Sequence, residues 1–307
     1  MAAGASLGAN LSSNIYKGKA LRLMLPSWVM IGIFLLIPVI LIGVYSFLTK
    51  EFRGGVLWDF SIASYDQFFL DRGLFGDEPP TIEWTYINIF FRSIQQAAIA
   101  TFLCLIIGFP TAWFIATRNE KSRPVWLFLI TIPYWVNLLI RTVSMKFLIR
   151  DSGPLNEFLL WSGLISEPLG LINTDFAVQL GLFYSYLPFM VLPIYASVER
   201  YDFSLSEAAA DLYAGAWTTL RLIILPVVKP GIIAGCILVF VPSLGAFLAP
   251  DLLGGAKNFM IGSLIEEQFK GAAGNWPFGA AISIILLTIV MVVLIIYARS
   301  QYKQEQK

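Results

Sequence analysis

Two features of this sequence combine residue types and spacings that can carry a mechanism. The first is the segment Ser204-Leu-Ser-Glu207-Ala-Ala-Ala-Asp211, which is followed by Gly215. Ser204 and Glu207 have the spacing of a capping box, whose side chains bind free N–H groups of the first helical turn. We therefore expect a helix from residue 205, a turn at Gly215, and a second helical stretch that ends at Pro226, because proline interrupts backbone hydrogen bonding. An amphipathic linker on a membrane surface is the alternative interpretation.

The second feature is Arg141, a charged residue well inside the apolar run 125–149. A charge at such depth in a membrane is costly unless it is paired or lies near water, so such residues are functional by default. We assign Arg141 to pairing or gating. A structural ion pair near the membrane edge is the alternative.

Other kinds of chemistry are excluded by what the sequence lacks. It contains no histidine, which rules out His-based metal sites, Ser-His triads and histidine proton relays. The two cysteines, Cys104 and Cys236, lie inside apolar runs, and we interpret them as small buried side chains. No G-x-x-x-x-G-K-[ST] phosphate loop occurs, so this chain is not expected to bind ATP through such a loop. We predict no catalytic residue, no metal site and no cofactor bound by this chain.

The composition indicates a membrane protein. Hydrophobic residues make up 57% of the 307 residues and charged residues only 13%, whereas soluble domains average about 25% charged residues. This balance excludes a nucleic-acid-binding protein, a disordered protein and most soluble enzymes. About 20 apolar residues cross a membrane core of roughly 30 Å as a helix. We predict an all-α, polytopic bundle whose six transmembrane helices are residues 23–48, 88–117, 125–149, 176–198, 230–250 and 278–298.

The distribution of basic residues predicts the orientation. With both termini in the cytoplasm, the cytoplasmic segments hold 12 of the 21 Lys and Arg residues, and 14 of the 20 acidic residues lie outside. The excess of basic residues inside follows the positive-inside rule. The predicted organisation is a cytoplasmic tail (1–22), a membrane domain (23–298) and a second cytoplasmic tail (299–307). The membrane domain includes an external loop (49–87) and a cytoplasmic loop (199–229).

The segment from Glu207 to Pro226 resembles the EAA loop of permease subunits in ATP-driven, binding-protein-dependent importers. The 19-residue spacing fits that family. Tyr213 departs from it, because the family usually has glycine there, and Gly215 follows two places later. The resemblance implies that this loop docks into a groove on a separate ATPase subunit. The residues assigned to this docking are Glu207, Ala208, Ala209, Asp211 and Gly215.

Further segments resemble spermidine/putrescine permeases, and this resemblance covers all six apolar runs. They are Pro133-Tyr-Trp135-Val-Asn137, Tyr186-Leu-Pro188-Phe-Met-Val-Leu-Pro193, Leu253-Gly-Gly-Ala-Lys-Asn258 and Trp276-Pro-Phe-Gly279-Ala-Ala. Relatives often have an acid where this chain has Asn275. The resemblance implies a type I importer permease in the bacterial cytoplasmic (inner) membrane. Implied partners are a second permease subunit in a heterodimer, two ATPase subunits that hold ATP and Mg²⁺, an external polyamine-binding protein and membrane lipid, without nucleic acid.

The resemblance also implies a path for polyamines, which are methylene chains with several ammonium groups. Such a path needs aromatic faces, which attract cations, together with a few acids or amides. An interfacial aromatic belt, ordinary packing and solvated loop charges are the alternatives. The residues assigned to this path are Tyr134, Trp135, Asn137, Tyr184, Tyr186, Asp251, Glu266 and Glu267.

Other functions stay open at this point. Within the same class, a permease for a different organic cation or for ferric iron is the alternative. An ion-coupled secondary transporter often has inverted repeats and intramembrane acids, and neither is evident in the sequence. A membrane scaffold protein would not need the EAA-type loop.

Overall fold

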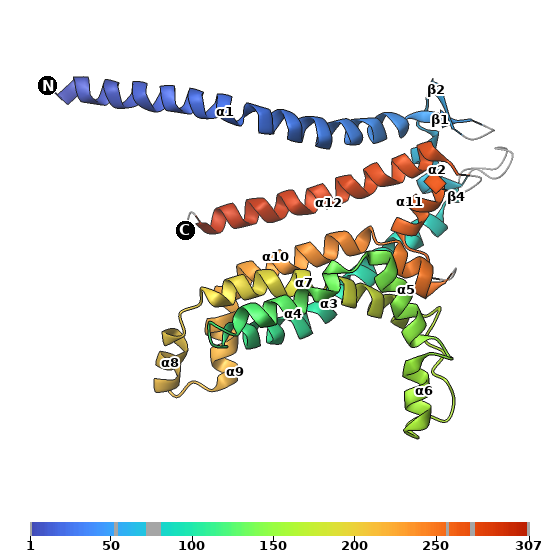
Figure 1. Cartoon of the computed structure of the whole chain (residues 1–307). Coiled ribbons are helices and arrows are strands. Elements are labelled where there is room, and N and C mark those ends of the chain that lie inside the picture. Colours follow the sequence, from blue (N-terminus) through green and yellow to red (C-terminus); the bar gives the residue numbers. More distant parts are fainter. Residues whose placement is uncertain (1, 52–54, 72–80, 256–257, 271–273, 306–307) are drawn as a thin grey trace. The chain divides into compact units, whose positions relative to one another are not determined.

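A computed structural model describes residues 2–51, 55–71, 81–255, 258–270 and 274–305 (Figure 1). The chain forms two units, which we name unit 1 (Met1–Glu78 with Ala272–Lys307) and unit 2 (Pro79–Gly271). Parts of several predicted segments lie outside the described residues. They are residue 1 of the first tail, residues 52–54 and 72–80 of the external loop, residues 256–257 of the glycine-containing motif, residues 271–273 of the membrane domain, and residues 306–307 of the second tail.

Unit 1 contains two long helices, a strand pair and a short helix. Its elements are α1 (Ala2–Tyr45), β1 (Leu48–Lys50), β2 (Val56–Phe60), α2 (Ala63–Phe69), β3 (Leu70–Asp71) and α12 (Trp276–Glu305). Strands β1 and β2 are antiparallel, and α12 packs against α1 and α2. Asn275 caps α12, because its Oδ1 accepts a hydrogen bond from the Phe278 N–H at 3.2 Å. Asparagine is among the preferred capping residues, so Asn275 supplies the cap of α12.

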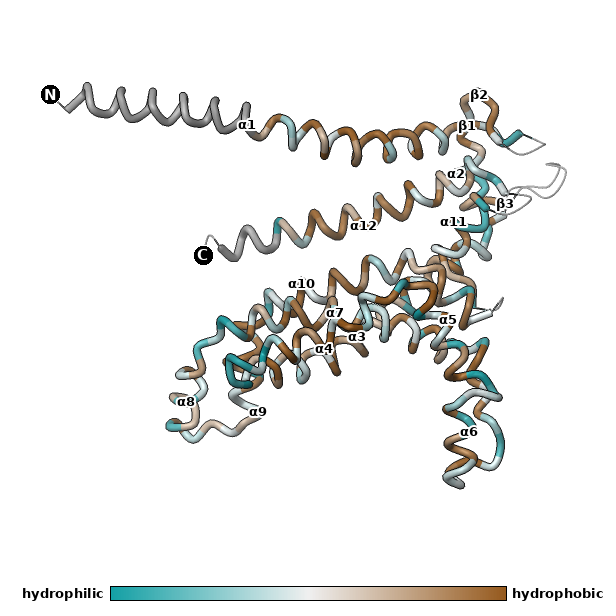
Figure 2. The backbone as a smooth tube through the Cα atoms, in the orientation of Figure 1, coloured by the Kyte–Doolittle hydropathy of each residue, from teal (hydrophilic) through white to brown (hydrophobic). Residues whose placement is uncertain are grey.

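Three long helices form the core of unit 2, namely α3 (Trp84–Ala116), α7 (Asp175–Glu199) and α10 (Leu225–Leu244). All three pack on one another, and their hydrophobic residues are visible in Figure 2. Small residues allow α10 to lie close to α7. A Cβ on Gly231 would collide with Ser197, and one on Gly235 would lie 2.8 Å from Met190 Sδ. These glycines therefore serve packing within the chain.

The third apolar run is broken. Helices α4 (Arg123–Trp135) and α5 (Leu138–Ile149) are separated by a break, and the segment Leu138–Trp161, which begins with α5, is bent by 90° from α4. The break comes where Val136 is extended and Asn137 begins a new helix by accepting the Leu139 N–H on its Oδ1 at 2.8 Å. The prediction of one continuous helix over residues 125–149 is therefore wrong. The short helix α6 (Pro154–Trp161) follows α5.

The connection between α7 and α10 carries α8 (Ser204–Asp211), α9 (Ala216–Thr219) and a π-helical turn, η1 (Leu220–Ile224). From Ala216 the helix runs on into α10, so the prediction that it ends at Pro226 is wrong. Pro226 lies in the first turn of α10. The wider π-helical turn directly before it gives room for the proline ring, which would otherwise meet the carbonyl four residues earlier.

The end of unit 2 opposite α8 is built from β4 (Thr81–Ile82), η2 (Pro250–Gly254) and α11 (Ile261–Lys270). A polar network connects it to α3 and α7. Arg92 Nη2 donates to Asp175 Oδ1 at 2.6 Å and also to Asn258 Oδ1. Gln96 Nε2 donates to the same Asp175 oxygen at 2.8 Å. These contacts fix the start of α7 and the segment after η2 on α3.

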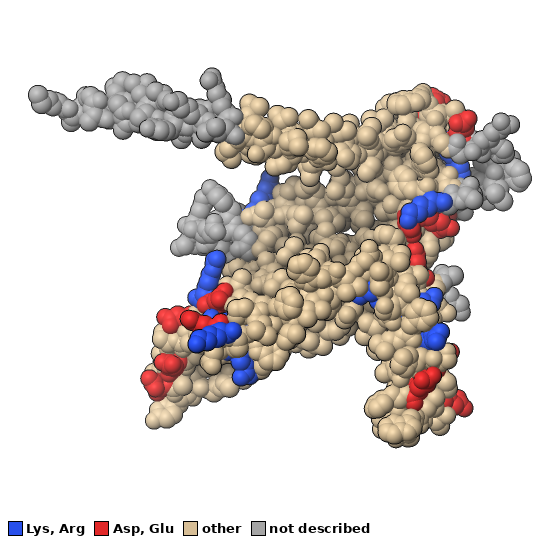
Figure 3. Space-filling view, in the orientation of Figure 1, with Lys and Arg blue, Asp and Glu red and all other residues tan. Residues whose placement is uncertain are grey.

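Within the described ranges, five helices are long and apolar enough to cross a membrane, and the bent α4–α5 pair makes a sixth if it is one span. Cys104 is buried, Cys236 is half-buried and both are free thiols, which confirms their interpretation as small packing residues. On the face shown in Figure 3, charged side chains of unit 2 gather around α8 and α9 and again around α6. The surface of unit 2 between these two regions is nearly uncharged, as a membrane-spanning bundle requires.

Candidate functional site

Helix α8 begins with a different cap from the predicted one. It starts at Ser204, and no capping-box hydrogen bond is present in this described part of the loop. Instead, Asp202 Oδ1 accepts a hydrogen bond from the Ser204 N–H at 3.0 Å. Hydrogen bonds from the Ser204 side chain and then its backbone lower the pKa of the exposed Asp202 carboxyl. The prediction failed because Asp202 accepts the Ser204 N–H that the Glu207 carboxylate would bind in a capping box, and the Glu207 N–H donates to the Phe203 carbonyl at 3.2 Å instead of to the Ser204 hydroxyl.

Helix α8 ends in a Schellman motif at Tyr213. The Tyr213 N–H donates to the Ala210 carbonyl at 2.9 Å, and the Ala214 N–H donates to the Ala209 carbonyl at 3.0 Å. Tyr213 has a φ of 59°, a left-handed conformation that suits glycine and costs other residues about 1–2 kcal/mol. Gly215 has a φ of −67°, which any residue adopts. The position that needs glycine is therefore Tyr213, and the turn predicted at Gly215 is corrected.

The sides of α8 differ in character. Ala209 is only 5% exposed and faces the chain's own interior, which corrects the expectation that its side chain contacts another protein. Glu207 and Asp211 lie one turn apart on the opposite, exposed side. Next to them runs an exposed stripe at helical spacing, which we name the apolar stripe and which consists of Leu205, Ala208 and Leu212.

Two large side chains extend the apolar surface beyond the helix. Tyr213 is 97% exposed and Trp217 is 72% exposed. Figure 1 shows α8 and α9 at the end of unit 2, away from the packed parts of its long helices. Exposed apolar surface of this kind marks a site of interaction with another protein or a membrane. Four of the predicted docking residues, Glu207, Ala208, Asp211 and Gly215, lie on this exposed part of the loop.

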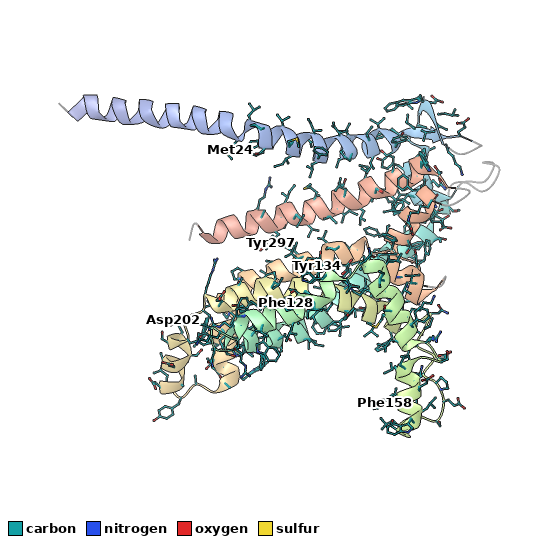
Figure 4. All side chains as sticks on the ribbon, viewed as in Figure 1. Met24, Phe128, Tyr134, Phe158, Asp202 and Tyr297 are labelled. Carbon is teal, nitrogen blue, oxygen red and sulfur yellow. The ribbon has the colours of Figure 1, made fainter. Side chains whose placement is uncertain are left out.

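An aromatic cluster, not foreseen from the sequence, joins this loop to the long helices. Trp113 on α3 lies 6.1 Å from Tyr201 and 5.7 Å from Phe203, measured between ring centroids, and the latter two rings are 5.3 Å apart. The Tyr201 hydroxyl lies 2.7 Å from the Ser206 hydroxyl on α8. Asp202, labelled in Figure 4, lies between the two aromatic residues in the chain. The loop is therefore attached firmly to α3 at its base.

A cavity of about 430 Å³ lies at the break between α4 and α5. It brings together four predicted path residues and Arg141. The predicted residues among its lining are Tyr134, Trp135, Asn137 and Tyr186. The sequence did not single out the remaining lining residues, because small or apolar side chains are common throughout membrane helices. They are Val136, Leu138, Ser185, Phe189 and Pro242. Tyr134, labelled in Figure 4, meets the Phe189 ring edge to face with centroids 5.0 Å apart.

Arg141 is nearly buried in the lining of this cavity. Its Nη2 donates to the Val136 carbonyl at 2.8 Å, and its Cζ lies 5.7 Å from the centre of the Tyr134 ring. Its Nε is buried without a hydrogen-bond partner in the described structure. The α4–α5 break creates this arrangement, because Arg141 sits in the first turn of α5 and reaches back to the carbonyl at the break.

The predicted acids lie elsewhere. Asp251 on η2 interacts with Glu266 on α11, and burial followed by contact with Glu266 and Glu267 raises the pKa of Asp251. Lys270 Nζ donates to Glu266 Oε1 at 2.5 Å, and this bond lowers the pKa of Glu266. None of these acids lines the cavity at the α4–α5 break, and neither does Tyr184. The predicted path residues thus form two separate groups, the aromatic and amide residues at the cavity and the three acids on η2 and α11. Tyr184 belongs to neither group.

Comparison with known proteins shows what the chain is similar to. No family model matches it. It is 42% identical over 273 residues to the spermidine/putrescine transport system permease protein PotB of Salmonella typhimurium, covering 89% of this chain and 90% of that one. The PotB protein of Escherichia coli K12 is 41% identical over 89% of this chain and 94% of its own length. The PotB protein of Haemophilus influenzae is 39% identical, over 89% of this chain and 90% of its own length.

Solved structures show the same fold. A bacterial ABC transporter involved in the import of the acidic polysaccharide alginate matches with a TM-score of 0.62 at 19% identity, over 97% of this chain and 100% of that one. The MetNI methionine ABC transporter matches with a TM-score of 0.52 at 16% identity, over 70% and 94%. The predicted fold class, an all-α membrane bundle like that of a type I importer permease, is confirmed. With about 40% identity over 89% of its length, the chain belongs to the family of PotB spermidine/putrescine transport system permease proteins.

Proposed function

We propose that this chain is the transmembrane permease subunit of an ATP-driven importer, and that it forms part of the path for spermidine and putrescine delivered by an external binding protein. The names of the relatives, at 39–42% identity, support the substrate class. The observation that carries the importer function is the exposed apolar surface of α8, Tyr213 and Trp217. In water this surface is unfavourable unless a partner covers it.

The proposed partner at α8 is an ATPase subunit, one of two that would bind ATP and Mg²⁺. The chain has no phosphate loop of its own. A second permease, in a heterodimer with this chain, would complete the membrane portion. In this arrangement the exposed apolar stripe enters a groove of the ATPase. Glu207 and Asp211 face its rim, where basic residues of the partner would match them.

Movement of the ATPase would reach the membrane helices through the aromatic cluster. Trp113 connects α8 to α3 through Tyr201 and Phe203, and α3 packs along α7 and α10. Tightly packed helices move as rigid bodies. A displacement of α8 is therefore passed to α7, which lines the cavity with Ser185, Tyr186 and Phe189.

The cavity at the α4–α5 break is the proposed polyamine path in this subunit. The rings of Tyr134, Trp135 and Tyr186 offer faces for methylenes and ammonium groups, each cation–π contact contributing roughly 0.5–2 kcal/mol. Arg141 opposes cations there. At an effective dielectric of about 20, an ammonium group about 5 Å from the guanidinium is repelled by about 3 kcal/mol. Transport through this cavity therefore needs that charge to be paired, which fits the proposed role of Arg141 in pairing or gating.

The proposed orientation places α8 in the cytoplasm, with both termini, in a bacterial inner membrane. The basic residues support it. Asp251, Glu266 and Glu267 then lie at the external end, where they attract cations towards the path. The carboxyl groups there are held by η2 and α11.

The test uses the purified complex of both permeases and the ATPases, with the binding protein added. Ala208→Trp places bulk on the apolar stripe, and Ala210→Trp places the same bulk on the other flank of α8 as a matched control. We expect Ala208→Trp to abolish ATPase binding and spermidine-stimulated ATP hydrolysis, and Ala210→Trp to retain most of both. Wild-type hydrolysis in Ala208→Trp would contradict docking through α8. Stimulation by another organic cation or ferric iron, but not by spermidine, would contradict the proposed substrate.

A further inference from the structure

The described lining of the cavity at the α4–α5 break includes the positive charge of Arg141 and no Asp or Glu. Arg141 is only 6% exposed, and its Nε has no hydrogen-bond partner among the residues that the structure describes. Within the described ranges, no carboxylate oxygen lies within 4.0 Å of its guanidinium. A buried charge without a counter-charge is strongly destabilising. The guanidinium has the Val136 carbonyl as an acceptor at Nη2, at 2.8 Å, but a matching negative charge would have to come from outside the described part of the chain.

The depth of the cavity limits what can supply that acceptor. Trp135 ends the 13-residue helix α4, about 20 Å from its start. On α7, Ser185 and Phe189 lie about 15 and 21 Å from the start of the helix at Asp175. Both measures place the cavity near the middle of a membrane core of roughly 30 Å. Lipid phosphate groups lie at the core's surfaces, too far away to reach it, and a polyamine has the wrong charge.

We propose that this cavity is a carboxylate socket, which receives an Asp or Glu side chain from a transmembrane helix of the second permease subunit. It rests on the proposed function, which supplies that subunit. The N–H groups of a guanidinium match the two oxygens of a carboxylate. The volume of about 430 Å³ accommodates such a side chain. Beside it Trp135 is 80% exposed, and Leu139 and Ile140 are also exposed, which gives the incoming helix an apolar surface.

This pairing removes the conflict between Arg141 and a cationic substrate. With the guanidinium neutralised, ammonium groups pass the rings of Tyr134 and Tyr186 without net repulsion. The chain alone presents a positively charged cavity, and only the assembled pair of permeases presents a cation path. The same contact thus stabilises the complex and prevents cation leakage through an unassembled subunit.

Charge reversal tests the socket in the full complex. Arg141→Glu places a second carboxylate against the proposed one, and Arg150→Glu reverses an exposed charge at the end of α5 as the control. We expect Arg141→Glu to reduce the co-purified second permease about tenfold or more, and Arg150→Glu to leave it within about twofold of wild type. Each Asp and Glu in the membrane spans of the second permease is then changed to Arg. One of these changes should restore at least half of the assembly lost in Arg141→Glu.

A neutral pair guards against misfolding of the charge-reversal variant. Arg141→Met alone should weaken assembly, and Arg141→Met together with the neutral amide form of the same partner acid should recover it. Wild-type assembly and uptake in Arg141→Met, or failure of every partner change to rescue, would overturn the socket. Spermidine uptake by the wild-type complex is measured in parallel. If a partner change restores assembly but the wild-type complex does not take up spermidine, the proposed substrate is contradicted and the socket is not. If the wild-type complex takes up spermidine but no partner change restores assembly, the socket is contradicted and the substrate is not.

Discussion

Replacing Tyr213 by glycine separates the conformation of the loop from its role in docking. The left-handed φ of 59° at Tyr213 destabilises the folded loop by about 1–2 kcal/mol. Glycine has no such penalty, but its greater backbone entropy in the unfolded chain costs about 0.5–1 kcal/mol on folding. The difference predicts that Tyr213→Gly stabilises the end of α8 by about 1 kcal/mol, which corresponds to about fivefold slower opening. Tyr213→Ala is the control, because alanine lacks the ring but keeps the unfavourable conformation.

Hydrogen exchange measures the opening directly, since the Ala214 N–H is bonded to the Ala209 carbonyl at 3.0 Å. We expect this amide to exchange about fivefold more slowly in Tyr213→Gly than in Tyr213→Ala. Both variants lose a ring that is 97% exposed, so both should bind the ATPase about 5- to 30-fold more weakly. Equal exchange rates in the two variants would refute the conformational reasoning. Wild-type ATPase affinity in both would refute the role of the ring.

Further predictions concern the path, the acids and the orientation. Trp135→Ala should lower spermidine uptake about 2- to 30-fold, with a smaller loss for putrescine, while ATPase binding persists; unchanged uptake would place the path elsewhere. Because the folded-state pKa of Asp251 is raised, the native state loses stability as pH rises through that pKa. Near neutral pH, Asp251→Asn should therefore melt at the same temperature as wild type or higher, and the difference in melting temperature should shrink in acid. Its spermidine uptake should fall. A melting temperature below that of wild type near neutral pH would contradict the destabilising effect assigned to the ionised Asp251. In a background with Cys104 and Cys236 changed to alanine, an impermeant maleimide should label Glu167→Cys in intact cells but not Gly215→Cys; the reverse pattern would invert the orientation.

Much of the fold follows from the length of the apolar runs. A run of about 20 apolar residues in a membrane has few alternatives to a helix, so the core helices α3 and α7 matched their predicted ranges closely. The break at Asn137 was harder to foresee. One asparagine barely changes the mean hydropathy of an apolar run, so hydropathy does not reveal that Asn137 caps a new helix. The start of the fifth span was misplaced for a related reason, because a π-helical turn allows Pro226 to stay within a helix.

The candidate site shows the same division. The motif around Glu207 located the exposed loop correctly. It did not show that Asp202 caps α8 or that Ala209 faces inward, because both depend on where the helix begins and on what it packs against. The aromatic path residues were brought together only in part. Spacing along separate helices does not specify depth, so Tyr184 and Asp251 could not be excluded from the cavity lining before the structure.

The most direct measurement of the central claim is spermidine uptake into proteoliposomes that contain the two permeases and the ATPases, with the binding protein outside and ATP inside. We expect uptake that requires this chain, stops with vanadate and is lost in Ala208→Trp but not in Ala210→Trp. Uptake that proceeds without ATP, or that persists in Ala208→Trp, would contradict an importer driven through α8.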